Sequence, residues 1–261
     1  MRCWLLILSL GFIASPALAQ DSDFCVDRPG LGTPACTIGR GQVMLEVGLL
    51  GWDHLADSFG IEDDLSSGDV LMRVGIDDLT ELRVGLGGYR SVRSRSLVSA
   101  RVSRNAGFGD VMIGLQRSLS GPGGPIAVQG FVTVPVGHSG IGAGDWGAGL
   151  LVPMGIDLPA GFELDLTPEL DAAVNSSGSG RHLAWGGVVG INHALGHKLA
   201  IAGELGAWRD NDPAGHSTGC RAALSLAWQA GPNLQIDLEG DLGLTSAAPD
   251  HSLMIGFARR F

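Results

Sequence analysis

Apolar and polar residues alternate with a period of two along most of this chain. In the clearest run, Leu234, Ile236, Leu238 and Leu242 alternate with Gln235, Asp237, Glu239 and Asp241. A period of two with one strongly polar face indicates β-strands that lie between an apolar and a polar environment. Carboxylates stacked along one face cannot contact hydrocarbon, so we expect that face to line a polar interior.

About 12 such segments can be placed, which predicts an all-β, transmembrane, antiparallel up-and-down β-barrel. The expected strands are 42–54, 66–76, 80–92, 106–118, 125–137, 144–158, 162–174, 182–195, 199–209, 217–230, 233–244 and 251–261. Short turns at every second junction are expected on the periplasmic side, and longer loops at 55–65, 93–105, 138–143, 175–181, 210–216 and 245–250 on the external side. An even number puts both termini in the periplasm. Barrels of ten or fourteen strands are the alternatives, because strand boundaries are the weakest part of such a prediction.

Composition supports a membrane barrel and excludes one class of partner. Gly occurs 42 times and charged residues make up 17% of the chain, while mean hydropathy is +0.24. After the first twenty residues no apolar stretch reaches the roughly 20 residues of a transmembrane helix. The formal net charge of −10 argues against nucleic acid. The basic cluster from Arg90 to Arg104 is expected to be a charged surface loop.

The first residues have the pattern of a secretory signal peptide. Arg2 precedes the apolar run 3–13, and Ala17-Leu18-Ala19 gives a cleavage site before Gln20. We therefore expect a signal peptide at 1–19, a periplasmic N-terminal segment at 20–40 and an outer-membrane barrel at 41–261. An N-terminal membrane anchor is the alternative.

Cys25 and Cys36 flank a short segment rich in proline and glycine. In an oxidising periplasm such a pair is expected to form a disulfide. The alternative is a metal site, which would need further His or Cys residues that this segment lacks. Cys220 is expected to be a free thiol.

The chain ends on an aromatic residue within a strand-like run. Leu253, Ile255, Phe257 and Phe261 share one face. This ending resembles the C-terminal signal that the barrel assembly machinery reads in bacterial outer-membrane proteins, which assigns the signal to Phe257 and Phe261. It implies location in the outer membrane with lipid as a partner.

Several segments resemble one family in the same order along the chain. They are Asp27-Arg-Pro-Gly30 between the two cysteines, Gly39-Arg-Gly-Gln-Val-Met-Leu-Glu46, Gly107-Phe-Gly-Asp110, Leu166-Thr-Pro-Glu-Leu-Asp171, Trp208-Arg-Asp-Asn-Asp-Pro213 and Ala258-Arg-Arg-Phe261. The chain is similar to the "putative MetA-pathway of phenol degradation" family. The resemblance implies an outer-membrane barrel associated with uptake of hydrophobic or aromatic small molecules, without catalytic residues to carry over.

The expected lumen carries mostly carboxylates. The candidate lumen-lining residues are Glu46, Arg73, Glu81, Arg83, Glu163, Asp165, Glu169, Asp171, Glu204, Arg221, Asp237, Glu239 and Asp241. An acidic excess favours cations over anions in a pore, whereas a hydrophobic solute would need an apolar entrance or a lateral opening. The alternative is a barrel plugged by salt-bridged side chains.

No catalytic site, metal site or cofactor is predicted. His216-Ser217 and His251-Ser252 are neighbours in sequence and would point to opposite faces of a strand. Histidines near the external strand ends lack metal-binding spacing. Trp52, Trp146, Trp185 and Trp208 are expected at the membrane interfaces. The sequence therefore favours a non-enzymatic channel or transporter. A closed structural or adhesive barrel with a filled lumen is the alternative, and an outer-membrane hydrolase ranks last.

Overall fold

The computed structural model describes residues 24–261, so the expected signal peptide lies outside the described residues. The strand segments are β1 (Val43–Ala56), β2 (Gly60–Ser67), β3 (Asp69–Gly75), β4 (Thr80–Leu86), β5 (Tyr89–Ser96), β6 (Val102–Phe108), β7 (Val111–Ser118), β8 (Ala127–Val134), β9 (Gly147–Leu151), β10 (Met154–Leu158), β11 (Phe162–Val174), β12 (Arg181–Leu195), β13 (Leu199–Asp210), β14 (Ser217–Gly231), β15 (Leu234–Gly243) and β16 (His251–Arg260). One short 3-10 turn, η1 (Pro159–Gly161), separates β10 from β11. Among the described residues, no helix has the length and apolarity needed to cross a membrane.

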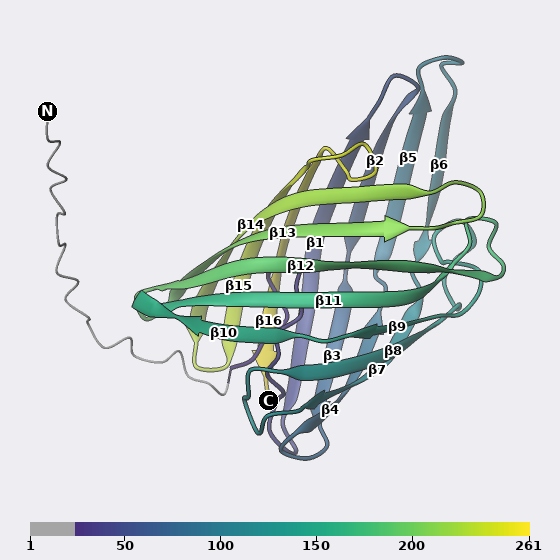
Figure 1. Cartoon of the computed structure of the whole chain (residues 1–261). Coiled ribbons are helices and arrows are strands. Elements are labelled where there is room, and N and C mark those ends of the chain that lie inside the picture. Colours follow the sequence, from purple (N-terminus) through teal and green to yellow (C-terminus); the bar gives the residue numbers. More distant parts are fainter. Residues whose placement is uncertain (1–23) are drawn as a thin grey trace, which may run out of the picture.

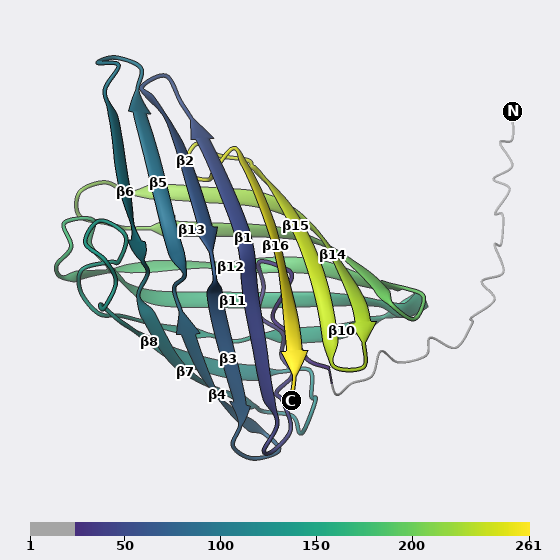
Figure 2. The ribbon, with the colours of Figure 1, turned by 180° about the vertical axis from the view of Figure 1, so that it is seen from behind.

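The segments form a closed antiparallel barrel (Figures 1 and 2). Four strands are each interrupted once, as β2/β3, β4/β5, β6/β7 and β9/β10, so the sixteen segments make twelve strands. β1 closes the ring on β16, with Met44 opposite Arg260 and His54 opposite His251. The predicted fold and strand number are confirmed.

Burial along the strands is the reverse of that in a soluble protein. On β15, Leu238 and Leu242 are 45% and 56% exposed, whereas Asp237 and Glu239 are 2% and 3% exposed. Because successive side chains point to opposite faces of a strand, one face of the wall is apolar and outward while the other is charged and inward. This arrangement suits hydrocarbon outside and a polar lumen inside.

The two ends of the barrel differ. β12 and β13 are joined by residues 196–198 and β14 and β15 by residues 232–233 at the end that holds the C-terminus. Longer connections, such as 135–146, lie at the other end (Figure 1). By the usual arrangement of such barrels, the end with the C-terminus is periplasmic and the other is external.

Two predicted external loops are wrong. Residues 55–65 and 93–105 are strands over most of their length, because β1, β2, β5 and β6 continue outward as paired hairpins (Figure 2). We call β2, β5 and β6 the external extension. It leaves the barrel where the strands are interrupted by glycines: a Cβ on Gly87 would lie 2.7 Å from the Cα of Gly109, so only glycine permits this close approach.

Candidate functional site: the barrel lumen

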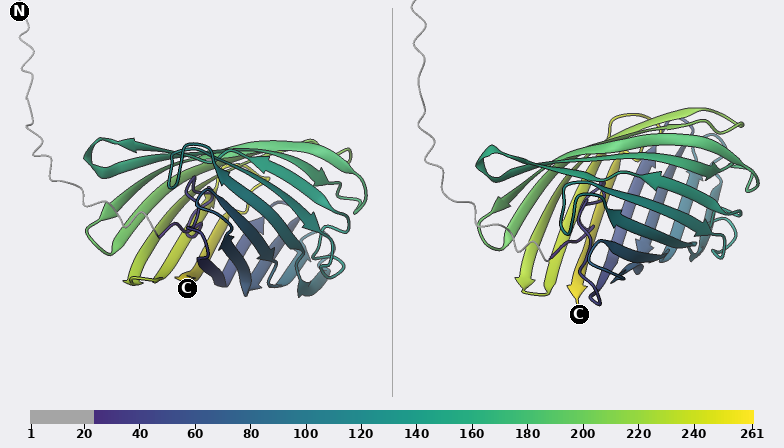
Figure 3. Two further views of the ribbon diagram at one scale, coloured as in Figure 1. Left: turned by 90° about the horizontal axis from the view of Figure 1, so that it is seen from below. Right: turned by 60° about the horizontal axis from the view of Figure 1, so that its bottom comes forward.

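The N-terminal segment lies inside the barrel. Residues 24–42 run along the lumen wall before β1 begins (Figure 3), whereas the sequence analysis places residues 20–40 in the periplasm. The Cys25–Cys36 disulfide is formed, as predicted, and closes a compact loop. We call residues 25–36 the lumen loop. Its position follows from charge, because the wall around it presents carboxylates and arginines that form hydrogen bonds and ion pairs with the loop.

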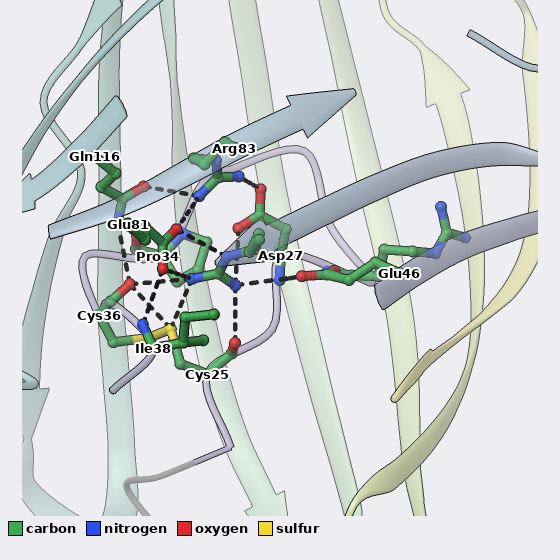
Figure 4. The surroundings of a disulfide bond; sticks show 11 residues. Cys25, Asp27, Pro34, Cys36, Ile38, Glu46, Glu81, Arg83 and Gln116 are labelled. Atoms are coloured by element: carbon green, nitrogen blue, oxygen red, sulfur yellow. Dashed lines mark hydrogen bonds and ion pairs between the residues drawn. A yellow bond between two sulfur atoms is a disulfide. The ribbon is translucent and has the colours of Figure 1, made fainter. Parts of the chain in front are cut away.

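Arg73 on β3 binds both wall carboxylates and the lumen loop. Figure 4 shows its partners Cys25, Glu46 and Glu81 around the disulfide. The Arg73 side chain is 0% exposed. It donates to Glu81 on β4 through Nε at 2.8 Å, to Glu46 on β1 through Nη1 at 3.2 Å, and to the Cys25 carbonyl at 2.8 Å. A buried charge is tolerated only when it is paired and hydrogen-bonded, and Arg73 meets both conditions.

A second buried arginine extends this cluster. Arg83 on β4 donates to Glu81 at 3.1 Å and to Gln116 on β7 at 2.8 Å, and it also contacts Asp27 of the lumen loop. Gln116 in turn donates to the carbonyls of Pro34 and Cys36 at 2.9 and 3.0 Å. Both ends of the lumen loop are therefore bound to the same wall.

Backbone N–H groups of the N-terminal segment bind four carboxylates of the wall. Residues 27 and 28 donate to Glu46, Gly30 donates to Glu239 at 2.6 Å, and residues 31 and 32 donate to Glu204 at 2.8 and 3.0 Å. Ile38 donates to Glu81 at 2.8 Å. Hydrogen bonds from backbone amides to carboxylates are charge-assisted and short. Much of the acidic lumen thus serves to hold the loop, a role that the strand pattern alone does not reveal.

The opposite wall carries carboxylates of a different kind. Five carboxylates face the lumen from β10 and β11: Asp157, Glu163, Asp165, Glu169 and Asp171. Within residues 24–261 none of them has an ion-pair partner. Asp165 accepts a hydrogen bond from Asn192. We call this set the acidic track.

Two cavities flank the lumen loop. The cavity on the periplasmic side, of about 540 Å³, is lined by Cys25, Cys36, Glu163 and Asp165 among others. The cavity on the external side, of about 520 Å³, is lined by Asp27, Glu46 and Arg83 among others. Arg28 lines both and forms an ion pair with Asp237 at 3.0 Å. The loop therefore divides the lumen into two chambers.

The other residues singled out from the sequence occupy various positions. Arg221 pairs with Asp241 at 3.4 Å in the lumen. Trp208 shares the inward face with Glu204 and lies 5.9 Å from the Arg221 guanidinium, so its predicted place at the membrane interface is wrong. The backbone N–H of Phe261 donates to Val43 across the closing seam at 2.8 Å. The role of Phe257 and Phe261 as an assembly signal stays a prediction.

Sequence reasoning missed Asp27, Arg28 and Gln116. Asp27 and Arg28 belong to a segment without strand periodicity, and their partners lie far away in sequence, as with Arg28 and Asp237. One signal is available in the sequence. Arg73 and Arg83 are expected to face the lumen, and the loop between the cysteines carries a carboxylate and a guanidinium side by side, at Asp27 and Arg28, which could pair with charged groups there.

The external loops hold two carboxylates whose acidity is increased. The pKa of Asp145 is lowered mainly by a hydrogen bond from the Trp146 backbone N–H, and further by Gly180 and Arg181. The pKa of Asp212 is lowered by backbone N–H groups of Ser176 and Ala214. Among the described residues, no group of three or more His, Cys, Asp or Glu side chains is arranged to hold a metal ion.

Solved structures share this architecture at low sequence identity. The COG4313 outer membrane channel from Pseudomonas putida F1 aligns with a TM-score of 0.63 at 14% identity, over 89% of this chain and 99% of the other. The translocator domain of the autotransporter NalP from Neisseria meningitidis aligns with a TM-score of 0.55 at 14% identity, over 85% and 89%. The β domain of the Bordetella autotransporter BrkA aligns with 0.54 at 10% identity, over 84% and 98%. These likenesses establish the fold, an outer-membrane β-barrel.

A search of curated proteins finds no match. The family is established instead by the sequence, because residues 26–261 match one family model, from the second residue of the lumen loop through every barrel strand. The chain belongs to the family described as "Putative MetA-pathway of phenol degradation".

Proposed function

We propose that the protein is a passive, non-enzymatic outer-membrane channel for small molecules, with the lumen loop as its constriction. The observation that carries the proposal is the divided lumen, in which cavities of about 540 and 520 Å³ lie on either side of the loop. A barrel packed only for stability has no need of two polar chambers. The likeness to an outer membrane channel from Pseudomonas putida F1 supports the same proposal.

The acidic track sets the charge preference of this channel. Glu163 and Asp165 line the periplasmic chamber without an ion-pair partner among the described residues. Carboxylates along a pore attract cations and repel anions. We therefore expect cationic and neutral solutes to pass more readily than anions of the same size.

Small aromatic molecules are candidate solutes within this proposal. The family description refers to phenol degradation, and the periplasmic chamber presents Phe24 and Val26 beside its carboxylates. Apolar side chains with a few polar groups are typical of sites that accept small organic ligands. An uncharged phenolic solute would combine contacts of both kinds.

Reconstitution in planar bilayers and in liposomes tests the proposal. The expected result is a measurable single-channel conductance with a reversal potential that indicates cation preference in a KCl gradient, together with uptake of neutral solutes. If the purified, folded protein shows neither conductance nor solute uptake, the proposal is wrong.

The second candidate is a closed structural or adhesive barrel. The density of contacts around Arg73 favours it, because the loop is bound at once to Glu46 on β1, Arg73 on β3 and Arg83 on β4. A closed barrel would keep the loop in place under all conditions and would conduct nothing, so the bilayer measurement separates the two functions.

A further inference from the structure

The basic cluster that the sequence places between Arg90 and Arg104 takes no part in holding the lumen loop, and its first member, Arg90, contacts Asp64 on the neighbouring strand. Five of the 17 basic residues of the chain fall in this interval, although the chain as a whole carries a formal net charge of −10. Four of them, Arg90, Arg93, Arg95 and Arg104, lie on β5 and β6 of the external extension. Positive charge is thus concentrated at one place on an acidic protein.

Strand register shows which of these residues face outward. Residues directly opposite each other in an antiparallel pair share a face. One row across the strands consists of His251, His54, Asp63, Arg93 and Arg104. The row next to it toward the barrel consists of Leu253, Trp52, Leu65, Ser91 and Ala106. Leu253 and Leu65 are 51% and 49% exposed, so both rows are on the outer face.

The charged row lies immediately outside an aromatic and apolar belt. Trp52, Tyr89 and Phe108 are 37%, 45% and 66% exposed on the outer face, where such side chains mark the level of the membrane interface. Two residues along a strand advance by about 6.8 Å. Arg93 therefore lies about one such step beyond Trp52, at the height of lipid headgroups rather than of acyl chains.

Arg93, Arg95 and Arg104 form few ion pairs with the described residues of the protein. Asp63 is shared by His54 at 2.8 Å and by Arg93 at 3.8 Å. Within the described part of the chain, neither Arg95 nor Arg104 has an ion-pair partner, and both side chains are exposed. β6, which carries Arg104, pairs with β5 on one side only. The surface beside Arg104 is open on the side away from β5.

We infer that this outer face of the external extension, formed by Arg93, Arg95 and Arg104, binds the phosphate-bearing headgroup of an outer-leaflet lipid. A guanidinium presents paired N–H donors that match two phosphate oxygens, so arginines at this height recognise phosphate in preference to an uncharged headgroup. Trp52, Tyr89 and Phe108 contact the upper part of the acyl chains of the same lipid. The inference does not depend on conduction through the lumen.

The test uses the full-length protein in detergent micelles, titrated with phosphorylated lipid A and with dephosphorylated lipid A. The expected result is tighter binding of the phosphorylated lipid, and a loss of affinity of about thirtyfold in R93A/R104A, since each arginine near a charged lipid surface contributes about fivefold in affinity. R117A/R209A is the matched control, because it removes the same charge from outward positions outside the patch. Its affinity is expected to stay close to that of the wild type.

Two results would overturn the inference. One is equal affinity of the wild type for phosphorylated and dephosphorylated lipid A. The other is an equal loss in R93A/R104A and R117A/R209A, which would mean that overall charge and not this patch decides binding. Because Arg93 and Arg104 lie outside the barrel wall, the heat-dependent shift in electrophoretic mobility that reports a folded barrel is expected in all variants and checks that each is intact.

Discussion

Two opposite walls of the lumen both carry buried or half-buried carboxylates, but these carboxylates have different surroundings. On β1, β3 and β4, Glu46 and Glu81 are 1% and 0% exposed and bind Arg73 and the N-terminal segment. On β11, Glu163 and Asp165 have no ion-pair partner among the described residues and border a cavity. The difference indicates that a carboxylate in a barrel lumen is structural where an arginine or a backbone N–H reaches it. It is available to a solute where none does.

Loss of Arg73 is expected to have the largest effect, a decrease in the free energy of unfolding that shows how strongly the first wall is stabilised by its ion pairs. R73A leaves the buried Glu46 without a guanidinium partner and removes one of the two arginines that bind Glu81, and breaking a buried ion pair in this way destabilises a protein by about 3–5 kcal/mol. Unfolding by guanidinium chloride in detergent or lipid measures the change. R117A, which removes an exposed outward arginine, is the control and is expected to stay within about 0.5 kcal/mol. Equal stability of the two variants would show that the first wall is no more structural than the surface.

Opening the lumen loop is expected to have the next largest effect. C25S/C36S removes the disulfide, and a disulfide typically contributes about 2–4 kcal/mol by restricting the unfolded chain. In the folded barrel the loop then loses a constraint, so we expect single-channel conductance to rise. C220S is the matched control, because Cys220 is a free thiol. A conductance that equals that of C220S would mean that the contacts with Arg73, Arg83 and Glu204 fix the loop unaided.

Neutralising the acidic track is expected to change selectivity and leave stability almost unchanged. E163Q/D165N removes two carboxylates that have no ion-pair partner in the described part of the chain, so the free energy of unfolding is expected to change by less than about 0.5 kcal/mol. The reversal potential in a KCl gradient is expected to move toward zero. D77N/D78N, at a periplasmic turn, removes the same charge elsewhere. An unaltered reversal potential in E163Q/D165N would argue against a role of this wall in selectivity.

The smallest effect concerns the external loops, which lie outside both walls. The folded state lowers the pKa of Asp212 below its ordinary value of 3.8, chiefly through the Ser176 and Ala214 backbone N–H groups. A lowered pKa means that this contact stabilises the folded loops at pH values above 3.8 and is lost as the pH falls through the lower, folded value.

Limited proteolysis of residues 175–180 and 211–216 measures this effect. We expect a constant cleavage rate from neutral pH down to about 4, a faster rate below it, and a smaller increase below pH 4 in D212N, where the contacts of Asp145 with Gly180 and Arg181 still titrate. Faster cleavage between pH 7 and 5 would contradict the assignment of the contact to Asp212.

The barrel itself could be predicted because the membrane imposes a period of two on every strand that crosses it. β15 shows this directly, with Leu238 outward and Glu239 inward. The external extension escaped prediction for the complementary reason. Above the aromatic belt both faces of β5 and β6 lie outside the hydrocarbon, so arginine and serine occupy either face and the alternation disappears.

The position of the lumen loop could not be predicted either. Its contacts join residues that are far apart in sequence, such as Gly30 with Glu239 and Leu31 with Glu204. Local pattern shows that Glu239 and Glu204 share a polar face, but it does not show which donor satisfies them. The cysteine pair could be predicted because spacing and compartment are local properties of the sequence.

The seam between β1 and β16 has a consequence for how the protein folds. It joins residues 44 and 260, so the ring cannot close until the last strand is in place, and closing a loop of that length is slow on entropic grounds. The segment 24–42 leads directly into β1, one edge of the seam. It can therefore take its place while the sheet is still open, and closure then encloses it. We therefore expect the barrel wall to close around a segment that is already in place, so that residues 24–42 act as a template for the ring.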